Sequence, residues 1–476
     1  MNKTLSDLLH RKSFLASIVI LGLFAVLAAA APVITPYSNP YLPSQARVAA
    51  PYAVPAWATV FPQYRNLPPN QNLILSTFRS EGGKVTEFNS TFLEVTVPPS
   101  GVVNVTFPVN WNYKPPYSFA VSFQLVPPKG YYILNVLIGQ GNRTFWLYSV
   151  VPKDYAIPPQ VGVPSTPSTI FLSSALLSAS NSPYVSTLSP TQQALSGIYL
   201  PIYVFRSPGT YNLTLSLNNE GSTPQVFVFS KPTFSDKGYA YGRLGTDDNG
   251  ASVFAEFVLG ARFDLFIGLV ASAMILAIGL VLGMLAGYVG GKVDLSLNAF
   301  TDFFLLLPGL PLLITVETIL VVSGAIVRVS LATVIVLLIA LLSWPGTMKI
   351  IRSQTLSLRS RTFVESSKAL GAGNFRIMMR HILPNLAGIL FAQLAYDVPG
   401  VILAESGLDF LGLGIRSFPT WGNMLGYATT AASTANSFAW WWVLPPGIGI
   451  VVLSLGFFYF GSALLDVLSP YRLRGE

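Results

Sequence analysis

Cysteine and histidine, two residue types on which much enzyme chemistry depends, are nearly absent from this chain. It has no cysteine, and its two histidines, His10 and His381, lie far apart in the sequence. A thiolate or histidine metal site and a Ser/His/Asp triad therefore lack the residues they need. The segment Gly287–Asp294, GYVGGKVD, suggests a phosphate-binding loop, but Ala286 stands where the first glycine should be and no Ser or Thr follows the lysine. We expect a chain with no catalytic site, no metal and no directly bound cofactor.

A basic segment that begins at Glu365, ESSKALGAGNFRIMMRHILPN, suggests a mechanical role instead. Thr362 and Glu365 have the spacing of a capping box, and Gly371 suits the left-handed position that ends a helix. A second short helix is expected to begin near Asn374 and to end before Pro384, because proline breaks a helix. The sequence thus predicts two short helices joined at a glycine.

Such a pair of helices would project from the membrane surface. We expect Phe363, Val364 and Leu370 to be exposed or half exposed, where they could dock into another protein. The alternative is an amphipathic hairpin that rests on anionic lipid, which its positive charge would also allow.

Six apolar runs are long enough to cross a bilayer and so to hold this projection in place. The chain has 476 residues, of which 51% are hydrophobic and only 10% are charged. Because lipid offers the backbone no hydrogen-bond partners, each run is expected to be a helix. The expected spans are Ser13–Ala31, Phe263–Tyr288, Asp302–Val322, Ser330–Lys349, Leu386–Leu403 and Trp441–Leu465. The first run could also be the core of a cleaved signal peptide, but its length favours an uncleaved anchor.

Basic residues near the ends of these runs predict the orientation. Seven lie between Lys349 and Arg380, whereas the loops after the third and fifth runs hold only Arg328 and Arg416. We therefore expect the basic loop and both termini on the cytoplasmic side of the cell membrane. This topology accounts for much of the net charge of +8, so the charge does not require nucleic acid as a partner.

Between the first two runs lies an insertion with a different sequence pattern, about Pro32 to Ala255. The predicted topology places it outside the cell. Alternating segments such as Phe119–Leu125 and Leu213–Leu217 are separated by Pro/Gly turns and predict antiparallel strands. We expect an all-β, sandwich-like extracytoplasmic domain. Its Ser/Thr/Pro-rich stretch Val161–Pro183 is expected to be a long loop or a linker between two β subdomains.

Glycosylation motifs cluster in the same insertion. Four Asn-x-Ser/Thr sequons occur there, at Asn89, Asn104, Asn142 and Asn212. Because a glycan must lie in water, their clustering favours an exposed, extracytoplasmic domain. A fifth sequon at Asn2 lies in the expected cytoplasmic tail, which shows that such tripeptides also arise by chance.

Glycines recur at helical spacing in the second run. Gly279, Gly283 and Gly287 are four residues apart and would share one helix face, which permits close contact with another helix. The alternative is that glycine is simply common in membrane helices.

The basic segment resembles the EAA loop of binding-protein-dependent ABC importer permeases, the element that couples the membrane subunit to its ATPase. The resemblance rests on Glu365, Ser366, Ser367, Gly371 and the pair Leu383-Pro384. Further blocks resemble the dipeptide/oligopeptide/nickel subfamily in the same order: LGTDDNG, LAGYVGGKVD, SWPG, ILAESGLDFLGLGI and WGNML. The chain is similar to the C-type subunit of a heterodimeric permease, loosely over residues 1–34 and closely over 241–476.

The chain also departs from the family pattern. Glu-Ser-Ser replaces Glu-Ala-Ala, which keeps small residues on the helix. Ala251-Ser252 replaces the Arg-Asp that follows LGTDxxG in the family, so the charge pairing of that dipeptide is in doubt here. The inserted β domain has no counterpart in the short outer loop of these permeases.

The resemblance implies an ABC transport subunit that is not itself an enzyme. It implies a second permease subunit, two ATPase subunits that bind ATP and Mg²⁺, and an extracytoplasmic substrate-binding protein. The expected domains are 1–34, with the cytoplasmic tail and first transmembrane helix; 35–240, the β-rich domain; and 241–476, the permease domain with five helices and a coupling loop at 360–385. Overall we expect an α-helical polytopic membrane protein with six transmembrane helices and an inserted β domain.

Substrate class is left open by the sequence. Di- or oligopeptides are the first expectation, and oligosaccharides or nickel are alternatives within the subfamily. Charged residues inside membrane spans often line a pathway, which makes Glu317 and Asp397 candidates; an outer-interface position and a cap at a proline kink are their structural alternatives. A rival of another class is a cell-surface glycoprotein or receptor that the helices merely anchor.

Overall fold

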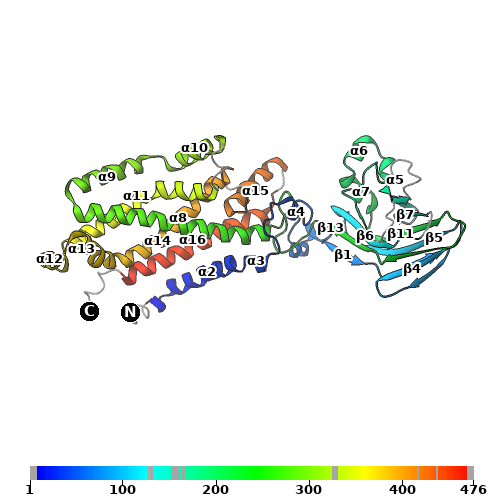
Figure 1. Cartoon of the computed structure of the whole chain (residues 1–476), viewed down its shortest axis with the longest axis horizontal. Helices are drawn as coiled ribbons and strands as arrows, with labels where there is room; N and C mark the ends of the chain where they lie inside the picture. The colour runs from blue at the N-terminus through cyan, green and yellow to red at the C-terminus, as the bar shows by residue number, and fades with distance from the viewer. Residues whose placement is uncertain are drawn as a thin grey trace. The chain divides into compact units, whose positions relative to one another are not determined.

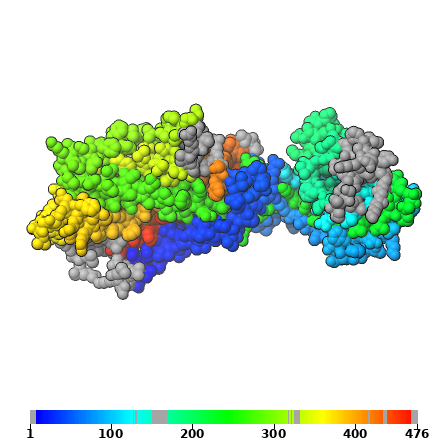
Figure 2. All heavy atoms as spheres, viewed as in Figure 1, coloured from blue at the N-terminus to red at the C-terminus, as the bar shows by residue number. Residues whose placement is uncertain are grey.

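The computed structural model describes residues 8–126, 128, 132–151, 161–162, 168–323, 331–414, 417–435 and 438–468. The chain forms two compact units, drawn in Figures 1 and 2. The helical unit comprises Met1–Gln45 and Val253–Glu476, and the β-rich unit comprises Ala46–Ser252. The β-rich unit thus begins and ends later than the expected 35–240, and it contains the LGTDDNG segment.

Long apolar helices dominate the helical unit, as the hydropathy predicts. Its elements, with one short helix at the boundary, are α2 (Lys12–Ala29), α3 (Ala31–Ile34), α4 (Pro43–Ala46), α8 (Val253–Val289), α9 (Gly291–Leu306), α10 (Gly309–Val322), α11 (Leu331–Arg359), α12 (Thr362–Ala369), α13 (Asn374–Ile377), a π-helical turn (Met378–Ile382), α14 (Leu383–Phe410), α15 (Trp421–Ala435) and α16 (Trp440–Leu468). Within the described residues, five helices are long and apolar enough to span a membrane, or six if the bent pair α9–α10 forms one span.

The third expected span, Asp302–Val322, is not one straight helix. α9 and α10 meet at an angle of 77°. The break falls at Leu307, which is extended with φ −69° and ψ 132°. Pro308 follows it, and a proline disfavours helical geometry in the residue before it. The prediction of a single helix was wrong because it relied on mean hydropathy, which stays high across the break.

The glycine face of α8 packs directly on α11, which confirms the predicted close contact. A Cβ added to Gly279 would lie 3.0 Å from the backbone nitrogen of Met348, and one added to Gly287 would lie 2.7 Å from the carbonyl oxygen of Arg352. The two helix backbones therefore touch, with no room for a side chain between them.

In the β-rich unit, two sheets pack face to face around one apolar core. Its strands are β1 (Gln71–Ile74), β2 (Arg79–Glu81), β3 (Lys84–Glu87), β4 (Phe92–Val97), β5 (Val102–Trp111), β6 (Ser118–Val126), β7 (Tyr132–Gln140), β8 (Arg143–Val151), β9 (Val161–Gly162), β10 (Ser168–Ser173), β11 (Gly209–Asn219), β12 (Gln225–Ser230) and β13 (Thr233–Lys237). One sheet has the order β1-β13-β6-β12-β4-β3, with β10 also paired to β6, and the other has the order β2-β5-β11-β7-β8-β9. The predicted strands in 119–125 and 213–217 are confirmed as parts of β6 and β11.

Two expectations for this unit were wrong. Part of the stretch Val161–Pro183 is strand β10, which pairs antiparallel with β6. Ile170 and Leu172 lie in the core and Phe171 between them is exposed, so the Ser/Thr/Pro-rich composition of the whole stretch hid a strand pattern. The unit is also not purely β, because it contains two 3₁₀ turns (Ala56–Val60 and Pro62–Tyr64) and the short helices α5 (Pro183–Ser186), α6 (Pro190–Ala194) and α7 (Ser196–Val204).

All four sequons of the insertion have accessible asparagines. Asn89 and Asn142 lie exposed in turns, whereas Asn212 is exposed on β11 and Asn104 is half-buried on β5. Asn89 Oδ1 accepts hydrogen bonds of 2.8 Å from the backbone N–H groups of Thr91 and Phe92. The geometry is compatible with attachment of a glycan at each site.

Candidate functional site

The segment that resembles a coupling loop folds as a helical hairpin at one end of the helical unit, near the start of α2 and the end of α16 (Figure 1). α12 ends at a turn in which Ala372 N–H donates to Ser367 C=O and Gly371 N–H donates to Lys368 C=O. This pairing is the Schellman motif, which requires a left-handed residue. Gly371 provides it with φ +81°, so the predicted left-handed position is confirmed.

The N-terminus of α12 differs from the prediction. The helix begins at Thr362 with Arg361 as N-cap, and no side chain caps it. Thr362 therefore already lies inside the first turn, and the capping box with Glu365 does not form. Glu365 and its neighbour Ser366 are exposed instead.

We expected the second helix of the hairpin to end before Leu383-Pro384, but it continues through these residues. α13 continues through the π-helical turn into α14, and proline lies in the first turn of α14. Proline has no N–H to donate to the carbonyl four residues earlier. The residue before it, Leu383, makes the wider π-type bond, from its N–H to the carbonyl of Met378 five residues earlier. Asn385 Nδ2 also donates to the His381 carbonyl at 2.7 Å. The hairpin is thus continuous with a membrane helix.

One face of the hairpin is buried and its tip is exposed. Val364, expected to be accessible, is 0% exposed because it packs with Ile377 against the end of α8 and the C-terminal half of α11. Leu370 and Phe375 are 88% and 73% exposed, and Phe363 is also exposed. These exposed apolar side chains leave the tip available to contact another protein or, in the alternative interpretation, lipid.

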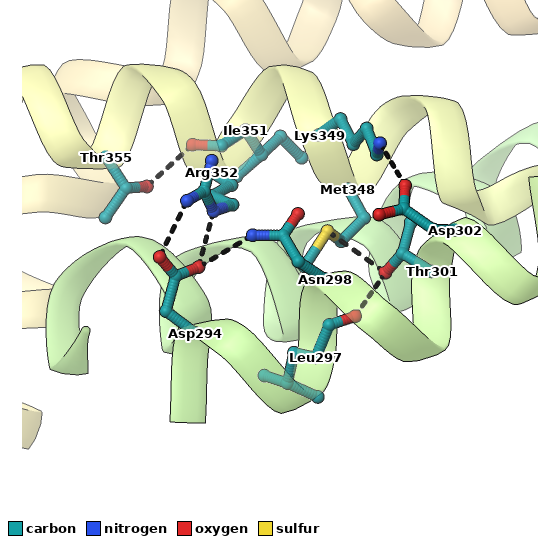
Figure 3. A network of polar contacts seen from close by, with 10 residues as sticks. All are labelled: Asp294, Leu297, Asn298, Thr301, Asp302, Met348, Lys349, Ile351, Arg352 and Thr355. Atoms are coloured by element: carbon teal, nitrogen blue, oxygen red, sulfur yellow. Dashed lines mark hydrogen bonds and ion pairs between the residues drawn. The ribbon is translucent and has the colours of Figure 1, made fainter. Parts of the chain in front are cut away.

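Ion pairs join α9 to α11 (Figure 3). Arg352 donates from Nε and Nη2 to both carboxylate oxygens of Asp294, at 2.5 and 2.6 Å. Asn298 donates to the same carboxylate, and Lys349 pairs with Asp302. A bidentate arginine–carboxylate contact fixes the relative orientation of the two side chains as well as their distance. The sequence analysis did not single out this pair, although Asp294 ends one of the family-like blocks.

Of the two pathway candidates, the structure places one in a polar group. Asp397 on α14 accepts hydrogen bonds from Gln393 Nε2 at 2.9 Å and from Thr347 Oγ1 of α11 at 3.1 Å. Asp397 is partly exposed in the isolated chain. Glu317 is part of α10, but its side chain lies outside the described residues.

A buried acidic cluster was missed entirely. Asp264 of α8 and Glu405 and Asp409 of α14 are 0–1% exposed; Glu256, nearer the start of α8, is also buried but accepts a hydrogen bond from Trp442 Nε1 at 3.2 Å. Asp264, Glu405 and Asp409 lie within electrostatic range of one another. The available signal was the presence of acidic residues inside otherwise apolar blocks.

Two residues of this cluster, Asp264 and Asp409, form hydrogen bonds at the start of α15. Asp264 Oδ2 accepts a hydrogen bond of 3.1 Å from the backbone N–H of Trp421, the first residue of that helix. Thr420 donates to Asp409 and accepts from the Asn423 N–H at 3.1 Å. The first N–H groups of a helix have no partner within the helix, so a carboxylate from α8 supplies one.

Two replacements of Asp264 should show whether its side chain caps α15 or only fills space in the core. Asp264→Asn keeps an oxygen acceptor for the Trp421 N–H, whereas Asp264→Leu leaves that buried donor unpaired. A buried unpaired donor costs about 1–3 kcal/mol, so the leucine variant should unfold at a lower temperature in detergent than the asparagine variant. Equal unfolding temperatures for the two variants would contradict the capping role.

The fold and the site together define a class of protein: a polytopic membrane permease subunit with a protruding helical hairpin. Residues 279–473 match the family described as "Binding-protein-dependent transport system inner membrane component". The chain belongs to this family and is a permease subunit of a binding-protein-dependent ABC importer.

Similar proteins come from several bacteria. The dipeptide transport system permease protein DppC of Bacillus subtilis (strain 168) is 33% identical over 290 residues, which cover 60% of this chain and 84% of that protein. DppC of Haemophilus influenzae is 32% identical over 302 residues, which cover 63% and 88%. The oligopeptide transport system permease protein OppC of Lactococcus lactis subsp. cremoris is 34% identical over 225 residues, which cover 47% and 74%.

Proposed function

We propose that this chain is the C-type permease subunit of an importer for di- or oligopeptides. It forms the translocation pathway with a second permease subunit, while two cytoplasmic ATPase subunits bind ATP and Mg²⁺ and an extracytoplasmic binding protein delivers solute. The observation that carries the proposal is the hairpin α12–α13, whose base is buried in the helical unit and whose apolar tip is exposed. The tip is the surface that an ATPase subunit contacts.

The substrate class rests on the relatives. Their names assign dipeptide or oligopeptide transport to those proteins. Peptides are therefore preferred over oligosaccharides and nickel. Asp397, with Gln393 and Thr347 as partners, is the described residue best suited to line the pathway, because a partly exposed carboxylate inside a span is costly unless it faces water or a partner.

Partner binding tests this function most simply. The tagged chain, purified in mild detergent from its native host, should bring down a second multi-span permease and two ATPases. Leu370→Asp together with Phe375→Asp should lose the ATPases but keep the second permease, since a charge on each apolar contact opposes docking. Recovery of the chain without a second permease or an ATPase would contradict the proposal and favour the anchored-receptor alternative.

The β-rich unit is proposed to lie outside the cell and to help dock the binding protein. It is inserted before Val253, the first residue of α8, whereas the hairpin packs near Tyr288 at the other end of that helix. A helix of 37 residues is about 55 Å long, enough to place its two ends on opposite sides of a bilayer. If the hairpin is cytoplasmic, the insertion emerges outside, where its sequons are available for glycosylation.

Excision of the β-rich unit should lower uptake at limiting solute. We would replace residues 46–252 with a short flexible linker and measure uptake over a range of binding-protein concentrations. Loss of a docking surface should raise the binding-protein concentration needed for half-maximal uptake by about tenfold, with little change at saturation. If both uptake and capture of the binding protein are unchanged, the unit has no docking role and is better explained as a protective cover.

A further inference from the structure

Tyr288, at the end of α8, contacts both helices of the hairpin. Its hydroxyl donates a hydrogen bond of 3.1 Å to Oδ1 of Asn374, the first residue of α13. The ammonium of Lys368, in the last turn of α12, lies 5.2 Å from the centroid of the Tyr288 ring. This distance is within the range of a cation–π interaction. One side chain thus joins the two hairpin helices on either side of Gly371.

Tyr288 is itself held firmly. It is only 4% exposed and belongs to an apolar cluster with Met284, Val364 and Ile377. Gly287, the residue before it, is where α8 touches the Arg352 carbonyl of α11. A force on the Tyr288 ring therefore acts on α8 and α11 together.

The covalent connections of the hairpin do not reach α8. α12 follows α11 in the chain, and α13 runs on into α14. α8 lies far earlier in the sequence, so it can follow the hairpin only through packing and side-chain contacts. The Tyr288 contacts to Asn374 and Lys368 are the polar part of that link.

We propose that Tyr288 is a positioning residue that transmits movement of the α12–α13 hairpin to α8. This inference rests on the proposed coupling function of the hairpin. It adds the route by which movement of the hairpin reaches α8, a helix that is not directly connected to the hairpin in the chain. Asn374 and Lys368 hold the two sides of the ring, and the apolar cluster keeps the ring in place.

A coupling role can be separated from a purely structural role. Tyr288→Phe keeps the ring and its apolar packing and removes only the hydroxyl. Asn374 is exposed, so its amide can bond to water when the hydroxyl is lost. A structural role thus predicts an almost unchanged protein, whereas the coupling role predicts a defect specific to energy transfer.

The experiment compares solute transported per ATP hydrolysed in the complete reconstituted importer. The Tyr288→Phe complex should show a ratio about 2- to 10-fold lower, the range for loss of one hydrogen bond, with an unchanged unfolding temperature. Asn374→Ala should lower the ratio to the same extent, and the double variant should be no worse than either single one, because both remove the same bond. The matched control is Tyr459→Phe, which removes a hydroxyl from a tyrosine on α16 that is 37% exposed.

An unchanged ratio in Tyr288→Phe, or a lower unfolding temperature without a change in the ratio, would overturn the inference. Gly371→Val in the same assay tells this failure apart from failure of the proposed function. If Gly371→Val lowers the ratio and Tyr288→Phe does not, the hairpin couples by another route. If neither lowers it, the coupling function itself is wrong.

Discussion

Replacing Gly371 with valine is expected to reduce ATP-driven uptake by about tenfold or more while leaving the complex assembled. Gly371 has φ +81°, and no atom lies within 4 Å of the position where a Cβ would be placed. The effect is therefore conformational, and a residue with a Cβ costs about 1 kcal/mol or more in this region, with β-branched residues costing more. Relief of that strain tilts α12 against α13, and a docked element displaced by about 1 Å can lose much of its activity.

Gly373 provides a matched control two residues away. It also has open space around its Cβ position, but its φ is −67°, which valine adopts readily. Gly373→Val should therefore transport normally at equal expression. Normal uptake by a correctly assembled Gly371→Val complex would rule out a hinge at Gly371 and would favour the lipid-facing hairpin.

Replacing Gly283 with valine should prevent the helical unit from folding correctly. A Cβ at this position would lie 2.7 Å from the Met348 carbonyl oxygen and 2.9 Å from Cβ of Ile351. The atoms in contact belong largely to the α11 backbone, which cannot rotate away as a flexible side chain could. Overpacking a tight contact costs about 1–3 kcal/mol, and a β-branched residue should exceed what one methyl group costs.

The milder Gly283→Ala variant allows this cost to be measured on folded protein. Its thermal unfolding in detergent would be compared with that of Gly346→Ala, because Gly346 lies on α11 with open space at its Cβ position. The Gly283 variant should unfold at a clearly lower temperature. Equal unfolding temperatures would show that the two helices can separate without cost, contrary to the close backbone contact.

Several features that depend on local sequence were predicted correctly, although the capping box of Thr362 and Glu365 and the helix end before Pro384 were not. The left-handed Gly371 and the glycine face of α8 both follow from what one residue type permits within its own helix. The strands around 119–125 and 213–217 follow from alternation along one segment. In each case the determinant lies within a few residues, so a single sequence contains it.

Features that depend on contacts between distant segments could not be predicted in the same way. Tyr288 and Asn374 are far apart in the sequence, and nothing in either segment indicates that they meet. Asp264 supplies a cap to Trp421 across the helical unit for the same reason. Val364 was expected to be accessible because a short surface helix alone gives no sign of what covers it.

Two errors arose because we used the mean hydropathy or composition of a segment instead of its individual residues. The run Asp302–Val322 is apolar on average, yet the chain turns at Leu307-Pro308. The stretch Val161–Pro183 is rich in small polar residues, yet Ile170 and Leu172 alternate into the core. In both cases the deciding signal was present in one or two positions.

The central claim is that this chain completes an ATP-driven importer, and uptake by a defined complex tests it most directly. Proteoliposomes would contain this chain, the second permease and both ATPases, with the binding protein and a labelled peptide on the side that it must face. The account predicts that peptide accumulates against its gradient only when hydrolysable ATP, the binding protein and this chain are all present. ATP hydrolysis by the full complex without accumulation of any peptide tested, or equal accumulation when this chain is omitted, would contradict it.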